Sequence, residues 1–266
     1  MLPEITAIDP ASPVLRAYSC YRSLIEATGT ALIPDLAFGG KLLYAGELDD
    51  EGRAIIIAAN VVGCATLAAT ADPADQKRAV REGTVDFSVK SLDEALRILK
   101  NEIRKHATVA VCVDLSTDEI EREMRERGVR PDLNRADASE NQFNLWATRT
   151  LWRHQGEPMQ SPATVVWAVE SLPAKWFPGF DSIALECLQS EDVWNRRWIG
   201  RSPRYLGRAG SSLHIVCADR GFAARFVDRS RNAVNNGDIN TAAVIWVASD
   251  AGSEAFKLQP AQQPSS

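Results

Sequence analysis

The segment 85–113, VDFSVKSLDEALRILKNEIRKHATVAVCV, contains the pattern that decides the fold. Its first residues, 85–89, are typical of a strand, and Ser91 begins the capping box Ser-Leu-Asp-Glu. Apolar residues at helical spacing follow until about residue 105. Residues 108–113 are small and β-branched and favour a second strand. A strand, a helix and a strand with short connections predict parallel strands joined by a crossover helix.

The same alternation extends in both directions along the chain. Further strands are predicted at 41–45, 54–59, 64–70 and 129–133, and further helices at 72–82 and 116–128. The fold class is therefore α/β, a Rossmann-like parallel sheet with crossover helices over residues 40–137. A helical lead-in is predicted at 1–39, a second, smaller α/β region at 138–256, and a disordered tail at 257–266.

The second region repeats the strand–helix–strand pattern once. Strands are predicted at 163–169, 213–218 and 242–248, with a Pro-, Trp- and Phe-rich loop after the first of them as far as residue 180. A helix is predicted at 222–236, closed by Gly237 and capped by Asp219. His214 lies within a strand pattern, which favours a packed histidine over a general base.

The composition excludes several classes of protein. The 266 residues are 45% hydrophobic and 24% charged, which is ordinary for a globular chain and excludes a disordered or fibrous one. The longest apolar stretch, 54–71, is interrupted by polar residues, so no membrane span is expected. Residues 1–10 carry two acids and no base, which disfavours a targeting signal. Five scattered cysteines predict a reducing cytoplasm and neither disulfides nor a metal site.

Basic side chains are concentrated in one stretch. Residues 196–231 hold nine arginines and two acids. This stretch predicts either an anion site, with Arg204, Arg220 and Arg225 as its candidates, or a surface of ion pairs. No sequence motif of nucleic-acid recognition accompanies it, so nucleic acid is not the expected partner.

Two other features have alternative interpretations. The acidic residues 47–51 predict a solvated hairpin turn between two strands, or otherwise a cation site, although they lack the spacing of a calcium loop. Cys187 is a weak candidate for a nucleophile, and the alternative is a buried thiol on a helix face.

An ordered series of short motifs resembles the urocanase (urocanate hydratase) family over about residues 15–250. The motifs are GKLLYAG at 40–46, Asn60, Asp72, Asp86, SLDEAL at 91–96, RGVRPD at 127–132, FPGF at 177–180, RWI at 197–199, PR at 203–204, and Gly237 with the strand at 243–245. Urocanases are about twice as long, so this chain resembles a shortened and divergent member.

The resemblance implies a fold that binds NAD, which urocanases use as an electrophile toward the substrate imidazole. The family's glycine-rich phosphate loop corresponds to residues 46–52, GELDDEG, where only Gly46 and Gly52 remain and acidic residues replace the others. Carboxylates oppose a pyrophosphate unless a cation lies between them. The resemblance places the family's other cofactor-binding positions at Thr70, Asp75, Ser116 and residues 137–141. Among residues 137–141, only Ser139 is the same residue as in the family. The family's active-site cysteine corresponds most nearly to Cys187.

The sequence therefore supports three hypotheses of function. The first is a urocanase-like Rossmann scaffold with a degenerate NAD site that binds a small ligand or a partner, with a cleft near Gly46, Gly52, Asn60, Ser116, Ser139 and Asn141. The second is an NAD-dependent lyase of the urocanate hydratase type. The third and weakest is binding of phosphate or nucleic acid through residues 196–231. A homodimer is a further hypothesis, because the tryptophans and the missing family segments leave apolar surface to cover.

Overall fold

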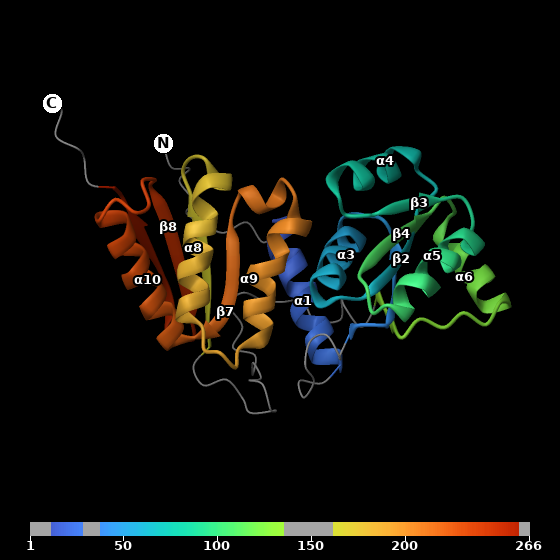
Figure 1. Ribbon diagram of the computed structural model, residues 1–266, viewed down its shortest axis with the longest axis horizontal. Coiled ribbons are helices and arrows are strands. Elements are labelled where there is room, and N and C mark those ends of the chain that lie inside the picture. Colours follow the sequence, from blue (N-terminus) through green and yellow to red (C-terminus); the bar gives the residue numbers. More distant parts are fainter. Residues whose placement is uncertain (1–11, 29–37, 136–161, 261–266) are drawn as a thin grey trace. The chain divides into compact units, whose positions relative to one another are not determined.

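The computed structural model describes residues 12–28, 38–135 and 162–260 (Figure 1). The chain divides into two compact units. One unit comprises residues 13–142 and 201–207, and we call it the parallel unit. The other comprises residues 1–12, 143–200 and 208–266, and we call it the antiparallel unit. No helix of the described residues has the length and apolar character that crossing a membrane requires.

The parallel unit is built on a five-stranded sheet in the order β3-β4-β2-β1-β5. All four strand pairings are parallel, as the sequence predicts. The strands are β1 (Leu42–Glu47), β2 (Ala65–Ala69), β3 (Phe87–Val89), β4 (Val109–Val113) and β5 (Leu133–Asn134). The three central strands are buried along nearly their whole length, which explains their continuous apolar sequences.

Helices cover both faces of this sheet. On one face lies α3 (Asp50–Val62), which contacts β1, β2 and β4, and α1 (Pro13–Thr28) packs on α3. On the other face, α5 (Leu92–Arg104) and α6 (Thr117–Glu126) pack against alternate residues of β1, β2 and β4. The helix α4 (Pro73–Glu82) joins β2 to β3. A parallel sheet with crossover helices on both faces is a Rossmann-like arrangement, so the predicted fold class is confirmed.

Local sequence signals set the ends of these helices. Asp72 caps α4 through the Ala74 N–H, with Pro73 in the first turn. The capping box at Ser116 is complete, because its hydroxyl accepts from the Glu119 N–H while the Glu119 carboxylate accepts from the Ser116 N–H. Gly128, beyond the end of α6, has a φ of 64°, which glycine adopts at little cost.

The antiparallel unit contains a four-stranded sheet in the order β7-β6-β8-β9. Its strands are β6 (Pro162–Val169), β7 (His214–Asp219), β8 (Ala243–Ser249) and β9 (Gly252–Leu258). All three pairings are antiparallel, and β6 separates β7 from β8, which therefore run parallel to each other. The predicted strand–helix–strand repeat is present as β7, α10 (Arg220–Asn235) and β8, with β6 inserted between its two strands.

Three predicted elements differ from the structure. Residues 54–59, predicted as a strand, lie in α3, which is buried from Gly52 to Val62 and so lacks the amphipathic period of a surface helix. The predicted loop as far as residue 180 is instead part of α8 (Pro173–Cys187), which contains Pro178. The predicted tail overlaps the end of β9, whose largely exposed sequence lacks the regular alternation of apolar and polar residues that predicts a strand. The remaining described elements are α9 (Val193–Leu206) and the 3-10 turn η1 (Ala209–Ser211).

Candidate functional site

The turn between β1 and α3 lies at the carboxyl ends of the parallel strands, where open α/β sheets bind their ligands. Gly46, the second-last residue of β1, has a φ of 71°. Gly52 lies in the first turn of α3, and a Cβ atom there would be 1.9 Å from the carbonyl oxygen of Glu47. Only glycine permits this close approach of helix to strand, which is characteristic of the first turn of a nucleotide-binding fold.

The acidic loop is therefore a strand-to-helix turn and not the predicted hairpin between two strands. Asp49 is the N-cap of α3, and its Oδ1 atom accepts a 2.7 Å hydrogen bond from the Gly52 N–H. Asp50 and Glu51 occupy the first turn, where acidic side chains interact favourably with the helix dipole. The chain's own carboxylate thus bonds to an amide of the helix N-terminus, the position that a phosphate occupies in dinucleotide-binding proteins.

Arg135, which follows β5, supplies a cation to this turn. Its guanidinium donates to Asp49 Oδ2 at 2.8 Å, to Glu51 Oε2 at 2.6 Å and to the Glu47 carbonyl oxygen at 3.2 Å. Burial raises the pKa of Asp49, but the hydrogen bonds from Arg135 and from the Gly52 N–H outweigh it and leave that pKa below its usual value. Arg135 therefore pairs with two of the four carboxylates of the acidic turn.

A second polar cluster lies at the carboxyl ends of β2, β3 and β4. The buried Gln76 side chain donates from Nε2 to the Thr70 carbonyl oxygen and to Asp114 Oδ1, both at 2.9 Å. Its Oε1 atom accepts from the Ser88 hydroxyl at 3.0 Å. The hydrogen-bonding atoms of the Gln76 amide are thus paired, and the cluster connects α4 to three strands of the sheet.

The structure brings together only some of the residues predicted for the cleft. Gly46, Gly52 and Ser116 all lie at the carboxyl edge of the sheet, and the Ser116 side chain is engaged in capping α6. Asn60 lies elsewhere: it is near the far end of α3, is 1% exposed, and donates to the Thr84 carbonyl oxygen at 3.4 Å. Ser139 and Asn141 lie outside the described residues.

Sequence reasoning did not identify Arg135 as part of this edge, nor Asp49 as a cap. The signal for Asp49 is present, because an aspartate followed by two acidic residues begins many helices. No local signal marks Arg135, which is 86 residues from Asp49 in the sequence.

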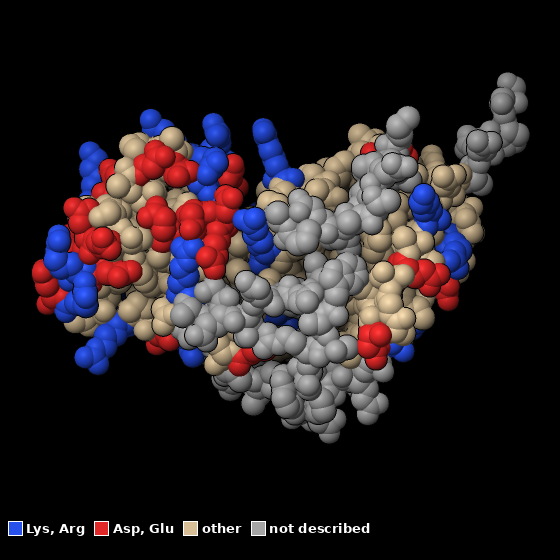
Figure 2. Space-filling view, turned by 180° about the vertical axis from the view of Figure 1, so that it is seen from behind, with Lys and Arg blue, Asp and Glu red and all other residues tan. Residues whose placement is uncertain are grey.

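The predicted anion candidates are engaged in different places. The Arg220 guanidinium pairs with Asp250 and donates to the Ser249 hydroxyl, and Arg225 donates to the Cys187 carbonyl oxygen at 2.9 Å. Arg204 lies over the Tyr205 ring and belongs to the parallel unit, unlike the other two. Further contacts of this stretch are the pairs of Arg229 with Glu186 and of Arg231 with Asp228. Figure 2 shows the opposite side of the molecule from Figure 1, and on that face too basic side chains lie among acidic ones. These contacts favour the interpretation of residues 196–231 as a surface of ion pairs and carbonyl contacts.

Cys187 ends α8 and is buried. Desolvation raises the pKa of its thiol, although the positive charges of Arg229 and Arg225 act in the opposite direction. A thiol in this state lacks the thiolate character of a nucleophile. Among the described residues, no group of three or more histidine, cysteine or acidic side chains is placed to hold a metal ion.

All five cysteines are buried, so we expect them to react slowly in the folded protein. Burial raises the pKa of Cys20 and of Cys112 to about 12, which leaves little thiolate at pH 8. Ellman's reagent at pH 8 should therefore modify less than about one thiol per chain within minutes, and all five in denaturant. Rapid labelling of Cys187 alone in the folded protein would contradict this expectation and restore Cys187 as a nucleophile.

The parallel sheet, the crossover helices and the close β1–α3 turn define the class of Rossmann-like domains. Within that class, residues 20–142 match the family model described as the urocanase Rossmann-like domain. The resemblance drawn from the sequence motifs is thereby confirmed over these residues. The resemblance of the later motifs, from 177 onward, stays a prediction.

Proposed function

We propose that this chain is a urocanase-like scaffold that binds a small ligand or a partner without holding NAD. The proposal rests on the 2.7 Å hydrogen bond that the Asp49 carboxylate accepts from the Gly52 N–H. The Arg135 guanidinium also donates to the carboxylates of both Asp49 and Glu51. A carboxylate already bonded to the helix N-terminus competes with a pyrophosphate for the same donor. NAD does not fit this turn unless Asp49 leaves its capping position.

A second proposal is the NAD-dependent lyase of the urocanate hydratase type, and two observations favour it. Gly52 keeps the close approach of helix to strand, and Gly46 keeps a positive φ of 71°, at the two glycines that remain of the family's phosphate loop. Arg135 also provides a cation beside the turn, which could pair with a pyrophosphate if its bonds to Asp49 and Glu51 were exchanged.

The NAD content of the purified protein distinguishes the two proposals. We expect mass spectrometry of the denatured protein to find much less than one NAD per chain, and added urocanate to keep its ultraviolet absorbance. A dehydrogenase with tightly bound NAD, taken through the same procedure, controls for loss of the cofactor. One NAD per chain, or loss of urocanate absorbance, would overturn the first proposal in favour of the lyase.

A double variant tests whether the carboxylates of Asp49 and Glu51 prevent NAD from binding at the β1–α3 turn. Asp49→Ser keeps an N-cap side chain but removes the charge, and Glu51→Gln removes the second carboxylate next to Arg135. If these groups exclude the dinucleotide, the double variant should gain affinity for NAD in isothermal titration calorimetry. The matched control is Asp72→Ser, which makes the same change at the cap of α4 and should leave NAD binding as it is in the native chain.

A further inference from the structure

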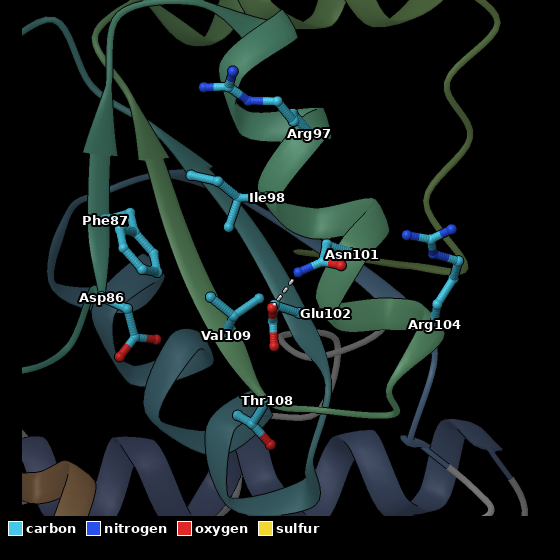
Figure 3. Close-up of a pocket in the computed structure, with 9 residues that line it drawn as sticks. All are labelled: Asp86, Phe87, Arg97, Ile98, Asn101, Glu102, Arg104, Thr108 and Val109. Atoms are coloured by element: carbon cyan, nitrogen blue, oxygen red, sulfur yellow. Dashed lines mark hydrogen bonds between the residues drawn. The ribbon is translucent and has the colours of Figure 1, made fainter.

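A groove of about 820 Å³ lies between α5 and the strands β3 and β4 (Figure 3). Cavities of this size are typical of small-molecule sites. Its lining includes Asp86, which precedes β3, and Thr108, which precedes β4. The groove is therefore near the ends at which the parallel strands begin, whereas the β1–α3 turn lies at their carboxyl ends. A ligand bound in this groove is independent of the function proposed for that turn.

The middle of the groove is apolar. Val109 of β4, Ile98 of α5 and Phe87 of β3 line it, and the Phe87 side chain is 48% exposed. Phe87 pairs with Val111, which belongs to the core beneath α5, so the Phe87 ring is on the same face of the sheet as α5. Figure 3 shows Ile98 directed from α5 toward the strands. An apolar ligand body in this space would remove these three side chains from water, which favours binding.

A cation lies at one end of the apolar surface. Figure 3 shows the Arg97 guanidinium beyond Ile98, at the end toward which β3 runs. Among the described residues, this guanidinium has no hydrogen-bond or ion-pair partner. A guanidinium presents parallel N–H donors that match the two oxygens of a carboxylate. This end of the groove is therefore suited to a carboxylate.

Two carboxylates lie at the other end, below Phe87 in Figure 3. Asp86 Oδ2 accepts from the Ala110 N–H at 2.8 Å. Glu102 Oε1 accepts from Asn101 Nδ2 at 2.9 Å and from Lys105 Nζ at 2.7 Å. In the described part of the chain, the second oxygen of each carboxylate has no donor. Ionised carboxylates only accept hydrogen bonds, so this end is suited to an ammonium group, which only donates them.

The distance between the two ends selects the length of a ligand. Arg97 and Glu102 are five residues apart on α5, which corresponds to about 8 Å along the helix axis. The Arg97 side chain, like others on a helix, extends toward the helix N-terminus and so away from Glu102. An α-amino acid carries both charges on one carbon atom and cannot reach the two ends together.

We propose that this groove binds a linear ω-amino acid, a zwitterion with an apolar chain between its charges. The ligand carboxylate pairs with Arg97, and the ligand ammonium lies between the carboxylates of Asp86 and Glu102. The methylene chain covers the apolar residues between the two ends. A ligand with a single charge leaves one end of the groove unpaired and binds more weakly.

Isothermal titration calorimetry with ω-aminooctanoate tests the proposal. The native chain should bind this compound roughly tenfold more tightly than octanoate or octylamine, each of which has the same chain length and one of its two charges. It should bind ω-aminobutanoate, which is too short to reach both ends, no more tightly than the singly charged compounds. Equal affinity for the three compounds of equal length, or no binding of ω-aminooctanoate at millimolar concentration, would overturn the proposal.

Two variants assign the two ends of the ligand. Arg97→Gln should bind ω-aminooctanoate about tenfold more weakly and octylamine as the native chain does. Asp86→Asn keeps an oxygen for the Ala110 N–H, and should weaken the binding of ω-aminooctanoate but leave that of octanoate unchanged. Native affinity for ω-aminooctanoate in both variants would also overturn the proposal.

Controls separate the groove from loss of folding and from general surface charge. Arg122→Gln removes an exposed arginine on α6, outside the groove lining, and should bind ω-aminooctanoate as the native chain does. Each variant requires a native circular dichroism spectrum. If Asp86→Asn fails to fold, Glu102→Gln replaces it and is expected to show the same pattern. An equal loss of affinity in Arg122→Gln would show that net charge, and not the groove, determines binding.

Discussion

Gly52→Ala should lower the free energy of unfolding of the parallel unit by about 3 kcal/mol, the upper end of the usual cost of overpacking. The added Cβ would be 1.9 Å from the Glu47 carbonyl oxygen and 3.1 Å from its carbon, and both are backbone atoms. They cannot move away easily, because Glu47 is paired with Ala69 and the Leu48 N–H donates to the Ala69 carbonyl oxygen. Urea denaturation followed by circular dichroism measures the change.

Gly200→Ala is the matched control for this substitution. Gly200 also lies within a helix, α9, but a Cβ there would have no heavy atom within 4 Å. Alanine is favoured over glycine inside a helix by roughly 0.5–1 kcal/mol, so this variant should be as stable as the native chain or slightly more stable. Equal stability of the two variants would show that α3 can withdraw from β1 without cost.

The close packing at Gly52 matters for the candidate site as well as for stability. It fixes the first turn of α3 against the end of β1, and so fixes the position of the Asp49 cap and of its 2.7 Å hydrogen bond. A loosened turn would change the geometry of the same amide that Asp49 and a phosphate would both bind. We therefore expect any change in ligand binding at this edge to accompany the loss of stability in Gly52→Ala.

Much of the parallel unit could be predicted from local sequence signals. Asp72, Ser91 and Ser116 begin helices at the predicted positions, because an N-cap side chain satisfies backbone donors within its own turn. The strands of small and β-branched residues between them are buried on both faces. Capping and strand propensity depend on residues that are close together in the sequence. These elements could therefore be predicted without knowledge of the tertiary packing.

The errors occurred where long-range packing overrides the local pattern. The apolar run at 54–59 gave no sign of helical periodicity, because α3 is enclosed between the sheet and α1 and buries nearly every side chain. The bond between Arg135 and Asp49 joins residues 86 positions apart, and no motif announces it. The glycines of the site could be predicted from the resemblance, but Arg135, the cation that pairs with Asp49 and Glu51, could not.

Asp181→Ala should destabilise the antiparallel unit by about 3 kcal/mol, because it removes the carboxylate that His214 and Trp167 share as a buried hydrogen-bond partner. Asp181 on α8 lies 2.7 Å from Nδ1 of His214, the first residue of β7, and their side chains are 13% and 10% exposed. The same carboxylate oxygen accepts from the Trp167 indole N–H at 3.3 Å. The variant leaves both buried groups without this acceptor, and each unmet buried donor costs about 1–3 kcal/mol.

The His214 ring is held from other directions too, so removing the carboxylate should not release it. It stacks on Phe177 at 4.0 Å between ring centroids, and its Nε2 atom lies 3.1 Å from the Gly210 carbonyl oxygen. Urea denaturation followed by tryptophan fluorescence measures the effect, because the tryptophans of the described residues belong to the antiparallel unit and Trp167 contacts the pair directly. Asp228→Ala is the control: it removes an exposed pair with Arg231 in the same unit and should cost less than about 0.5 kcal/mol. Equal losses in the two variants would mean that the Asp181–His214 pair contributes no more than a surface contact.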